Sequence, residues 1–390
     1  MSLFDKIHTD FEHQFVKNNP NYLESLFGTK DVAPFWIADM DFKVAAPITN
    51  ELQRLVTRGM YAYEFDTNKI FQAIADWNLK RHQLKLHRKS FVQVPGVLTG
   101  IALLIRELSN EGDGVMVQTP VYHQFYQIIK TAHRKIVRNP LKIVDGRYEM
   151  NFEDLEQKLQ TENVKILLLC NPHNPVGRVW NKIEMQKLTD LATTYNVTII
   201  SDEIHSDIIY ANTKFNSIAS FSDKHITILG SPAKTFGMQS ISCGYLYIPN
   251  KDIFTNIKAT IGSMYLDHGN AFSTFATIAA YTKGEKWVDE LVMYLEKNRN
   301  WIQNFVHTEI PQIKIFVPEG TYQIWLDFSK LYMSDEELKN LIFTKAKLAL
   351  TPGTWFDENH TQFMRMNIAS PLSKLEEAFS QLKNAIHEHI

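Results

Sequence analysis

The stretch "VKILLLCNPHNPVGRVWNKIEMQKLTDLATTYNVTIISD", residues 164–202, decides the fold. It opens with an apolar run at 164–170 and closes with another at 197–202, and each run predicts a buried strand. Between them Asn181 is an expected N-cap with Glu184 three residues later. Apolar residues then recur at helical spacing, namely Leu188, Leu191, Ala192 and Tyr195. Strand, helix and strand in this order form a βαβ unit, which predicts a largely parallel sheet.

The segments on either side extend this pattern. Further strands are expected at 114–118, 225–230 and 244–248, and "VPGVLTGIALLIREL", residues 94–108, predicts a helix. Amphipathic patterns predict helices around 283–297 and over 371–390, and the segments "GTYQIWLDF" and "KLALTPGTWF" between them suggest a small separate sheet. The expected fold is therefore α/β, with a mostly parallel central sheet, helices on both of its faces, and a smaller α+β domain.

These expectations divide the chain into three parts. Residues 1–47 form an N-terminal segment that packs with the small domain, residues 48–284 form the large domain that holds the ligand, and residues 285–390 form the small C-terminal domain. The 390 residues are 44% hydrophobic and 22% charged, which is the composition of a soluble globular protein. Neither repeats nor low-complexity segments interrupt this organisation.

Charge and targeting signals limit the expected partners and location. The formal charge is −2, with acids and bases interspersed, so neither nucleic acid nor a membrane surface is indicated as a partner. The start "MSLFDKIHTDFEHQ" lacks the basic flank and long apolar stretch of a secretion signal, which favours a cytoplasmic protein. Cys170 and Cys243 lie in or beside apolar runs, so we expect reduced, buried thiols and no disulfide.

Polar side chains follow three neighbouring strands. Asn174 comes shortly after the 164–170 strand, Asp202 ends the next strand, and Lys234 follows the 225–230 strand on an expected loop. The carboxyl ends of parallel strands meet at one edge of a sheet, where open α/β folds bind ligands. Taken singly, these residues are a turn amide, a helix cap and a solvated cation. Their succession on adjacent strands favours a ligand site.

An amine, a carboxylate and an amide are the groups that pyridoxal phosphate needs. An amine holds the aldehyde, and an anion keeps the ring nitrogen protonated, so Lys234 and Asp202 suit these tasks. The Asn174 amide suits the phenolic oxygen. A phosphate favours the amides at a helix start, which Val97, Leu98 and Thr99 supply after Gly96, and Ser231 adds a hydroxyl. Tyr122 offers an aromatic face, although a lone tyrosine is more often part of a core.

Several longer motifs resemble a known family. "CNPHNPVG", "SDEIHSDI" and "SPAKTF" resemble fold-type I pyridoxal phosphate enzymes of the class I/II aminotransferase superfamily, over nearly the whole chain. Within that superfamily, "FWIADMDF", "EGTYQIWLDF" and "FMRMNIASP" resemble the MalY/PatB-type cystathionine β-lyases, which are carbon–sulfur lyases. The resemblance implies a homodimer in which Tyr63 reaches the phosphate held by the neighbouring subunit.

The same resemblance implies roles for individual residues. It assigns Lys234 to the Schiff base with the cofactor, Asp202 to the ring nitrogen, Asn174 to the phenolic oxygen and Tyr122 to stacking. Arg365 is assigned to the substrate carboxylate, which a guanidinium binds through two parallel hydrogen bonds. In full, the implied cofactor-binding residues are Tyr63, Val97, Leu98, Tyr122, Asn174, Asp202, His205, Ser231 and Lys234, and the implied substrate-binding residues are Ala38, Tyr122, Asn174 and Arg365.

The chain also departs from the pattern of this family. Ser242 stands eight residues after the lysine, where many relatives have a phosphate-binding arginine, and Gly237–Ser240 differ from the usual turn after "KTF". His123 and Gln124 stand where relatives often have prolines; they would alter specificity if they faced the substrate entrance, but we expect a solvated His123. His205 follows Asp202 by three residues, but no third ligand stands at a fitting spacing, so we expect no metal site.

These assignments lead to one preferred function and two alternatives. The preferred function is β-elimination from cystathionine or another cysteine S-conjugate, in which Lys234 removes the α-proton and a thiol, pyruvate and ammonia are released. The first alternative is an aminotransferase that produces an α-keto acid with the same residues. The second is a regulatory protein that binds pyridoxal phosphate without turnover.

Overall fold

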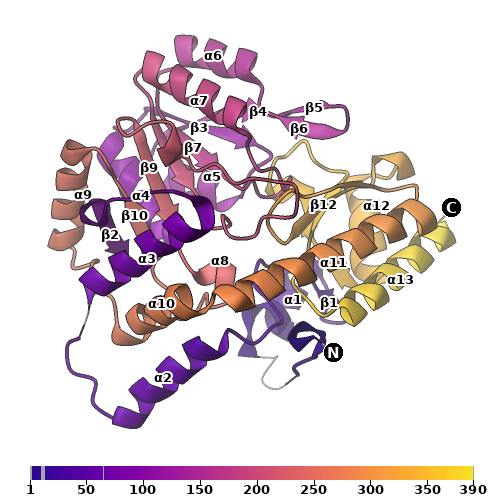
Figure 1. The fold of residues 1–390 in the computed structure, drawn as a ribbon. Helices are drawn as coiled ribbons and strands as arrows, with labels where there is room; N and C mark the ends of the chain where they lie inside the picture. The colour runs from indigo at the N-terminus through magenta and orange to yellow at the C-terminus, as the bar shows by residue number, and fades with distance from the viewer. Residues whose placement is uncertain (1, 10–13, 65, 390) are drawn as a thin grey trace.

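The computed structural model describes residues 2–9, 14–64 and 66–389. Its large sheet has the strand order β2-β10-β9-β8-β7-β3-β4 (Figure 1). The strands are β2 (Phe91–Val94), β3 (Gly114–Thr119), β4 (Lys135–Pro140), β7 (Val164–Cys170), β8 (Thr198–Asp202), β9 (Ile226–Gly230) and β10 (Gly244–Tyr247). Only β10 within this sheet runs antiparallel to its neighbours, β2 and β9. The predicted, mostly parallel sheet is therefore confirmed.

Helices cover both faces of this sheet, as predicted. One face packs against α4 (Val97–Leu108), α5 (Gln124–Thr131) and α9 (Lys251–Ser263). The other packs against α3 (Thr67–His82), α6 (Phe152–Thr161), α7 (Lys182–Thr194) and α10 (Ala271–Lys283). Successive side chains of a strand point to opposite faces, so Val115 and Val117 join the first cluster and Met116 joins the second.

The start of α7 shows why the central βαβ unit forms where the sequence predicts it. The Asn181 side-chain oxygen accepts a hydrogen bond from the Glu184 amide at 3.0 Å, and the Glu184 carboxylate accepts one from the Asn181 amide at 2.8 Å. This reciprocal capping box satisfies amides that the first helical turn leaves without partners. Residues 164–202 thus form the predicted strand, helix and strand.

A second, smaller sheet lies beside the large one (Figure 1). Its antiparallel strands follow the order β11 (Lys314–Phe316), β12 (Gln323–Asp327), β15 (Phe363–Asn367) and β14 (Thr351–Pro352). The long helices α11 (Glu285–Glu309) and α13 (Leu372–His389) pack together beside it. This is the expected small α+β part, and the limits at residues 47 and 284 stay a prediction.

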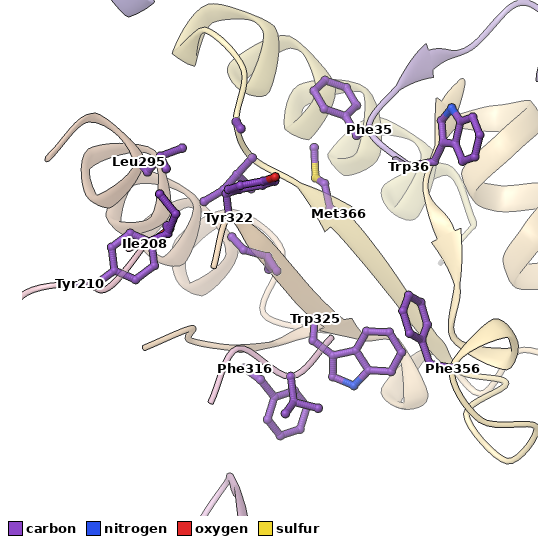
Figure 2. Packing of buried hydrophobic residues seen from close by; sticks show 14 of the residues in the cluster. Phe35, Trp36, Ile208, Tyr210, Leu295, Phe316, Tyr322, Trp325, Phe356 and Met366 are labelled. Carbon is purple, nitrogen blue, oxygen red and sulfur yellow. The ribbon is translucent and has the colours of Figure 1, made fainter. Parts of the chain in front are cut away.

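The N-terminal segment reaches this smaller part. Strand β1 (Ala33–Pro34) pairs in parallel with β13 (Leu348–Ala349), and the amide of Phe35 donates to the carbonyl of Ala349 at 2.9 Å. Residues 35–41 then run along β15, where the Asn367 amide donates to the Phe35 carbonyl at 2.9 Å. Figure 2 shows Phe35 and Trp36 beside the strand that carries Met366. Through this segment, backbone carbonyls near the N-terminus lie next to strand β15, which is near the C-terminus in sequence.

The remaining elements connect these layers. They are α1 (Pro20–Phe27), α2 (Ala46–Arg58), α8 (Ala233–Phe236), α12 (Asp335–Lys339), the hairpin β5 (Lys142–Val144) and β6 (Arg147–Glu149), the 3-10 helices η1 (Leu3–Asp5), η3 (Val16–Asn18), η4 (Arg88–Ser90), η5 (Ile218–Ser220), η6 (Ser329–Leu331) and η8 (Gly353–Trp355), and the π-helix η7 (Asn340–Lys345). Among residues 2–9, 14–64 and 66–389, no helix is long and apolar enough to cross a membrane. Cys170 and Cys243 are buried free thiols.

Candidate active site

Three adjacent strands bring the predicted polar residues to one edge of the large sheet. Strands β9, β8 and β7 are neighbours, and Asp202 at the end of β8 pairs with Cys170 at the end of β7. Asn174 lies in the turn that follows Cys170. Lys234 lies in α8, a single helical turn after β9, so the predicted loop is wrong. Pro232 precedes this turn with a φ of −70°, a conformation suited to a helix start, and its carbonyl accepts from the Phe236 amide at 3.0 Å.

The Lys234 amine is held in a partly buried position. Its Nζ donates a hydrogen bond to the carbonyl of Ala38. Burial lowers the pKa of Lys234 to about 8, an effect that the nearby Arg365 charge reinforces and the Asp39 and Asp202 carboxylates oppose. A lysine with this pKa has a substantial neutral fraction near neutral pH, so the amine is available as a nucleophile or a base.

Asp202 is a desolvated carboxylate close to this amine. It is 6% exposed, and one of its oxygens accepts a hydrogen bond from the Ile204 amide at 3.1 Å. Burial raises the pKa of Asp202 to about 6, while the hydrogen bond from Ile204 and the charge of Lys234 oppose the rise. Burial disfavours the charged form of this carboxylate, and a cationic ring nitrogen beside it would stabilise that charged form.

Arg365 extends from β15 of the small sheet toward Asn174, in the turn that follows β7 of the large sheet. Its Nη1 donates to Asn174 Oδ1 at 3.2 Å, and its Nη2 donates to the Trp36 carbonyl at 2.5 Å and to Thr351 Oγ1 at 3.1 Å. These contacts use only the oxygen of the Asn174 amide, so its Nδ2 group stays available as a donor. The arrangement joins the two sheets and the N-terminal segment around one guanidinium.

The charge of Arg365 has no acidic partner in the described part of the chain. All of its hydrogen-bond acceptors are neutral, its side chain is 3% exposed, and its Nε is buried without a partner. Burial lowers the pKa of Arg365 to about 10. Because an unpaired buried charge is costly, the site is suited to an anionic ligand, such as a carboxylate that binds two guanidinium nitrogens.

The site also uses backbone carbonyls that side-chain patterns do not reveal. The Ala38 carbonyl accepts from Tyr322 Oη at 3.3 Å and from Gln239 Nε2 at 3.5 Å, in addition to Lys234. Asn367 Nδ2 donates to the carbonyls of Ile37 at 2.7 Å and Asp39 at 2.6 Å. The sequence prediction included Ala38 but missed Tyr322, Gln239, Thr351 and Asn367. Their partners are main-chain atoms, or residues distant in sequence, so no local pattern identifies them.

Two ring side chains complete the surroundings of Lys234. Burial raises the pKa of Tyr122, and the charges of Arg365 and Asp202 also act on it, which places the phenol near both groups. His205 is buried, its ring packs edge-on against Tyr322 at 5.4 Å, and its Nδ1 has no partner. Burial lowers the pKa of His205 to about 3, assisted by the charges of Lys234 and Arg365, so the imidazole is neutral.

The expected phosphate-binding residues lie at a neighbouring point of the same edge. Helix α4 begins at Val97 after Gly96, without a side-chain cap, so the first amides, including that of the partly exposed Leu98, lack an acceptor within the helix. A Cβ at Gly244 would lie 2.9 Å from Gly96 C and Val97 N, so this close approach of β10 requires glycine. Ser231 Oγ donates to the adjacent Cys243 carbonyl at 2.8 Å.

Two predicted residues differ in position from the rest. Tyr63 is fully exposed, in the segment between α2 and α3, and makes no contact with the Lys234 site of its own chain among the described residues. His123 is half-buried, with its ring against Tyr122 at 5.0 Å and Trp355 at 5.6 Å, so the expected solvated histidine is wrong. The cause is η8 of the small-sheet region, which covers the loop that carries His123. The next residue, Gln124, begins α5.

Taken together, these groups fit pyridoxal phosphate. The site offers a partly neutral amine, a desolvated carboxylate, a free amide donor and an uncapped helix start, within a set of groups that act on one another electrostatically. These features match the aldehyde, ring nitrogen, phenolic oxygen and phosphate of the cofactor. In the described ranges, no group of three or more His, Cys, Asp or Glu side chains is arranged to hold a metal ion.

Comparison with known proteins agrees with this chemistry. The family model "Aminotransferase class I and II" matches residues 57–382. Cystathionine beta-lyase PatB of Bacillus subtilis is 38% identical over 93% of this chain and 94% of its own length. Protein MalY of Escherichia coli is 32% identical over 94% of both chains.

Solved structures resemble the whole fold. A PLP-bound protein from Clostridium difficile, provisionally described as an aminotransferase, has a TM-score of 0.95 at 38% identity and covers 98% of this chain and 99% of its own. Cystalysin from Treponema denticola, which contains a pyridoxal 5'-phosphate cofactor, has a TM-score of 0.92 at 28% identity, covering 100% of this chain and 99% of its own.

Proposed function

Because this chain belongs to the class I and II aminotransferase family, we propose that it is a carbon–sulfur β-lyase that uses pyridoxal phosphate. Its substrates are cystathionine or other cysteine S-conjugates, and its products are a thiol, pyruvate and ammonia. The observation that carries this choice is the full-length likeness to Cystathionine beta-lyase PatB. The site supports it with an unpaired buried Arg365 for a carboxylate and a nearby amine for proton transfer.

Each part of the cofactor has a candidate residue in this chain. Lys234 holds the aldehyde, Asp202 holds a proton on the ring nitrogen, and the free donor of Asn174 binds the phenolic oxygen. The phosphate is bound by the first amides of α4, which are those of Val97 and Leu98, with Ser231 beside them. When bound, the cofactor supplies a conjugated ring that withdraws electrons from the α-carbon of the substrate.

The protein residues then bind the substrate and move its protons. Arg365 binds the α-carboxylate through two guanidinium nitrogens, which orients the α-hydrogen toward Lys234. Once the substrate amino group has replaced Lys234 at the aldehyde, the freed Lys234 Nζ takes the α-proton, and its pKa of about 8 keeps part of the amine neutral for this step. The bond between the β-carbon and sulfur breaks, the sulfur leaves with the electron pair, and the Lys234 ammonium returns a proton to the thiolate. The released unsaturated amino acid is then hydrolysed by one water molecule to pyruvate and ammonia.

The test of this function is a product assay with and without a keto acid. Cystathionine and several cysteine S-conjugates should each release thiol, pyruvate and ammonia over many turnovers without an added keto acid. A thiolate is a good leaving group, so elimination should be faster than proton return to the cofactor. Thiol release that stops after about one turnover per site, and resumes only with pyruvate or 2-oxoglutarate, would contradict the lyase.

One observation favours an aminotransferase as the second candidate. The similar Clostridium difficile structure is provisionally described as an aminotransferase, and the residues named here serve both reactions. In that case alanine and a keto acid should exchange their amino group at a rate well above that of thiol release. A regulatory protein without catalysis would instead show the absorbance of bound cofactor and negligible turnover with either set of substrates.

Tyr63 leads to a prediction about assembly. We propose a homodimer in which the exposed Tyr63 of one subunit reaches the phosphate site of the other, and the cytoplasmic location stays a prediction. Tyr63→Phe should weaken cofactor retention about tenfold with little change in melting temperature, because one hydrogen bond to a charged group is lost. Dialysis of the holoenzyme followed by absorbance measures this loss. Tyr332→Phe, at another fully accessible tyrosine, is the matched control.

Mixing of inactive variants tests the sharing of sites. Lys234→Ala subunits carry an intact Tyr63, and Tyr63→Ala subunits carry an intact Lys234, so each hybrid dimer contains one complete site. Random reassociation should recover about a quarter of the wild-type activity. A monomer at assay concentration, or no recovery after subunit exchange has been verified, would contradict shared sites.

A further inference from the structure

His123 lies where the loop after β3 meets the small-sheet region. Its ring contacts Tyr122 at 5.0 Å, Trp355 at 5.6 Å and Phe356 at 6.2 Å, in each case edge to face. The guanidinium of Arg365 lies over the same Phe356 ring, 4.9 Å from its centre. His123 and Arg365, the residue proposed to bind the substrate carboxylate, therefore both contact the Phe356 ring.

One ring nitrogen of His123 lacks a partner. Its Nδ1 is buried without a hydrogen bond to any of the described residues. The Nε of Arg365, whose guanidinium lies over the same Phe356 ring, is buried and unpaired as well. Because unpaired buried polar atoms destabilise a fold, these two atoms, one on each residue beside Phe356, would be stabilised by a ligand that supplies their missing partners.

The loop does not need His123 for its own attachment. The Phe356 carbonyl accepts from the Val121 amide at 3.2 Å and from Tyr126 Oη at 2.7 Å, on both sides of His123 in the chain. A phenylalanine would provide the same ring packing without an unpaired nitrogen. Packing alone therefore does not account for an imidazole at this position.

The charge state of His123 suits recognition of a polar group. Burial, assisted by the charge of Arg365, lowers its pKa to about 4, so the ring is neutral at neutral pH. A neutral imidazole can both donate and accept a hydrogen bond. The positive charge of Arg365 beside it favours a ligand group that carries negative charge.

We propose that His123 determines specificity by hydrogen bonding to a polar group at the far end of the substituent on the substrate sulfur. This inference rests on the proposed lyase function and narrows its substrate class to cysteine thioethers with a polar, preferably carboxylate-bearing, substituent. Arg365 takes the α-carboxylate, so a second recognition group serves the rest of the molecule. Trp355 is only half-buried, which places this aromatic cluster at the outer edge of the site, where a substituent would extend.

Two substrates of equal length test the proposal. The substituent on the cysteine sulfur of cystathionine has four carbons, and the last two carry the amino group and form the carboxylate. S-butylcysteine has four carbons at the same place, without the amino group or the carboxylate. His123→Phe should lower kcat/KM for cystathionine about tenfold more than for S-butylcysteine, mainly through KM, since the lost contact is remote from the reacting atoms. His123→Asn should restore much of the preference, because its amide places a donor and an acceptor close to the position of Nδ1.

Controls separate the possible results. His87→Phe, at an exposed histidine, should leave the ratio of the two kcat/KM values unchanged. The dissociation constants of the two thioethers can be measured by absorbance in the Lys234→Ala background, where no turnover occurs. His123→Phe should change the ratio of these two constants by the same factor as it changes the kinetic ratio. If His123→Phe leaves the ratio of the two kcat/KM values unchanged, the proposed role of His123 is wrong, while the proposed lyase function stands. A wild-type protein that cleaves neither thioether overturns the proposed lyase function, and the substrate class with it.

Discussion

Lys234→Ala is expected to remove the covalent link to pyridoxal phosphate and to lower turnover by about 10⁴- to 10⁶-fold. Lys234 Nζ is the amine that hydrogen bonds to the Ala38 carbonyl, and the charge of Asp202 acts on it, so the variant lacks the group expected to form the link. The absorbance of the linked cofactor should disappear. Borohydride reduction followed by peptide mass analysis should find no modified residue in the segment that contains α8.

The fold should survive this substitution. The neighbouring Thr235 donates from Oγ1 to Asp207 at 2.8 Å, and Phe236 is fully buried, so α8 keeps its anchors. Alanine is also a favourable helix residue. Lys165→Ala, at an exposed lysine of β7, is the control and should retain both cofactor and activity. A borohydride-reducible link that persists in Lys234→Ala would show that another lysine holds the cofactor.

Arg365→Lys is expected to lower kcat/KM by about 10²- to 10³-fold while the bound cofactor keeps its absorbance. The guanidinium reaches Asn174, Trp36 and Thr351 at once, and an ammonium on a shorter side chain cannot replace these contacts or bind a carboxylate at two points. Steady-state kinetics with cystathionine, together with cofactor absorbance and melting temperature, measures the effect.

Arg178→Lys provides a contrasting control for this experiment. Arg178 is also buried, but it already pairs with Glu184 and Glu319, each at 3.0 Å, and so has its acidic partners within the protein. Its substitution should lower the melting temperature without raising KM for the folded fraction. Equal values of KM for Arg365→Lys and the wild type would contradict the assignment of Arg365 to the substrate carboxylate.

Regular patterns made the central part of the fold predictable. The strands at 114–119, 164–170, 198–202 and 226–230 are short apolar runs, and α7 carries a capping signal at Asn181, so each element is specified by neighbouring residues. The order of Asn174, Asp202 and Lys234 followed from the parallel sheet. Strand β2, with four residues, and the antiparallel direction of β10 depend on pairing with distant strands, which local patterns do not encode.

Contacts made by backbone atoms or across domains were less predictable. The Ala38 and Trp36 carbonyls bind Lys234 and Arg365, but a carbonyl is present at every residue and has no distinguishing signal. Whether His123 is solvated depends on Trp355, more than two hundred residues later in the chain. Such positions require the tertiary structure, because the neighbours of a residue in space are not its neighbours in sequence.

The pairing of β1 with β13 has a consequence for synthesis on the ribosome. Large-domain strands near Lys234 emerge first and can begin to fold during translation, whereas Ala33 must wait for Leu348, and Trp36 for Arg365. Bringing the two ends of so long a loop together costs conformational entropy. Only the contacts made by the later partner can offset that cost, so the loop closes after this partner has been synthesised. The nascent chain therefore gains Lys234 and Asp202 long before Arg365, and on the proposed assignment substrate recognition is among the last properties that the growing polypeptide acquires.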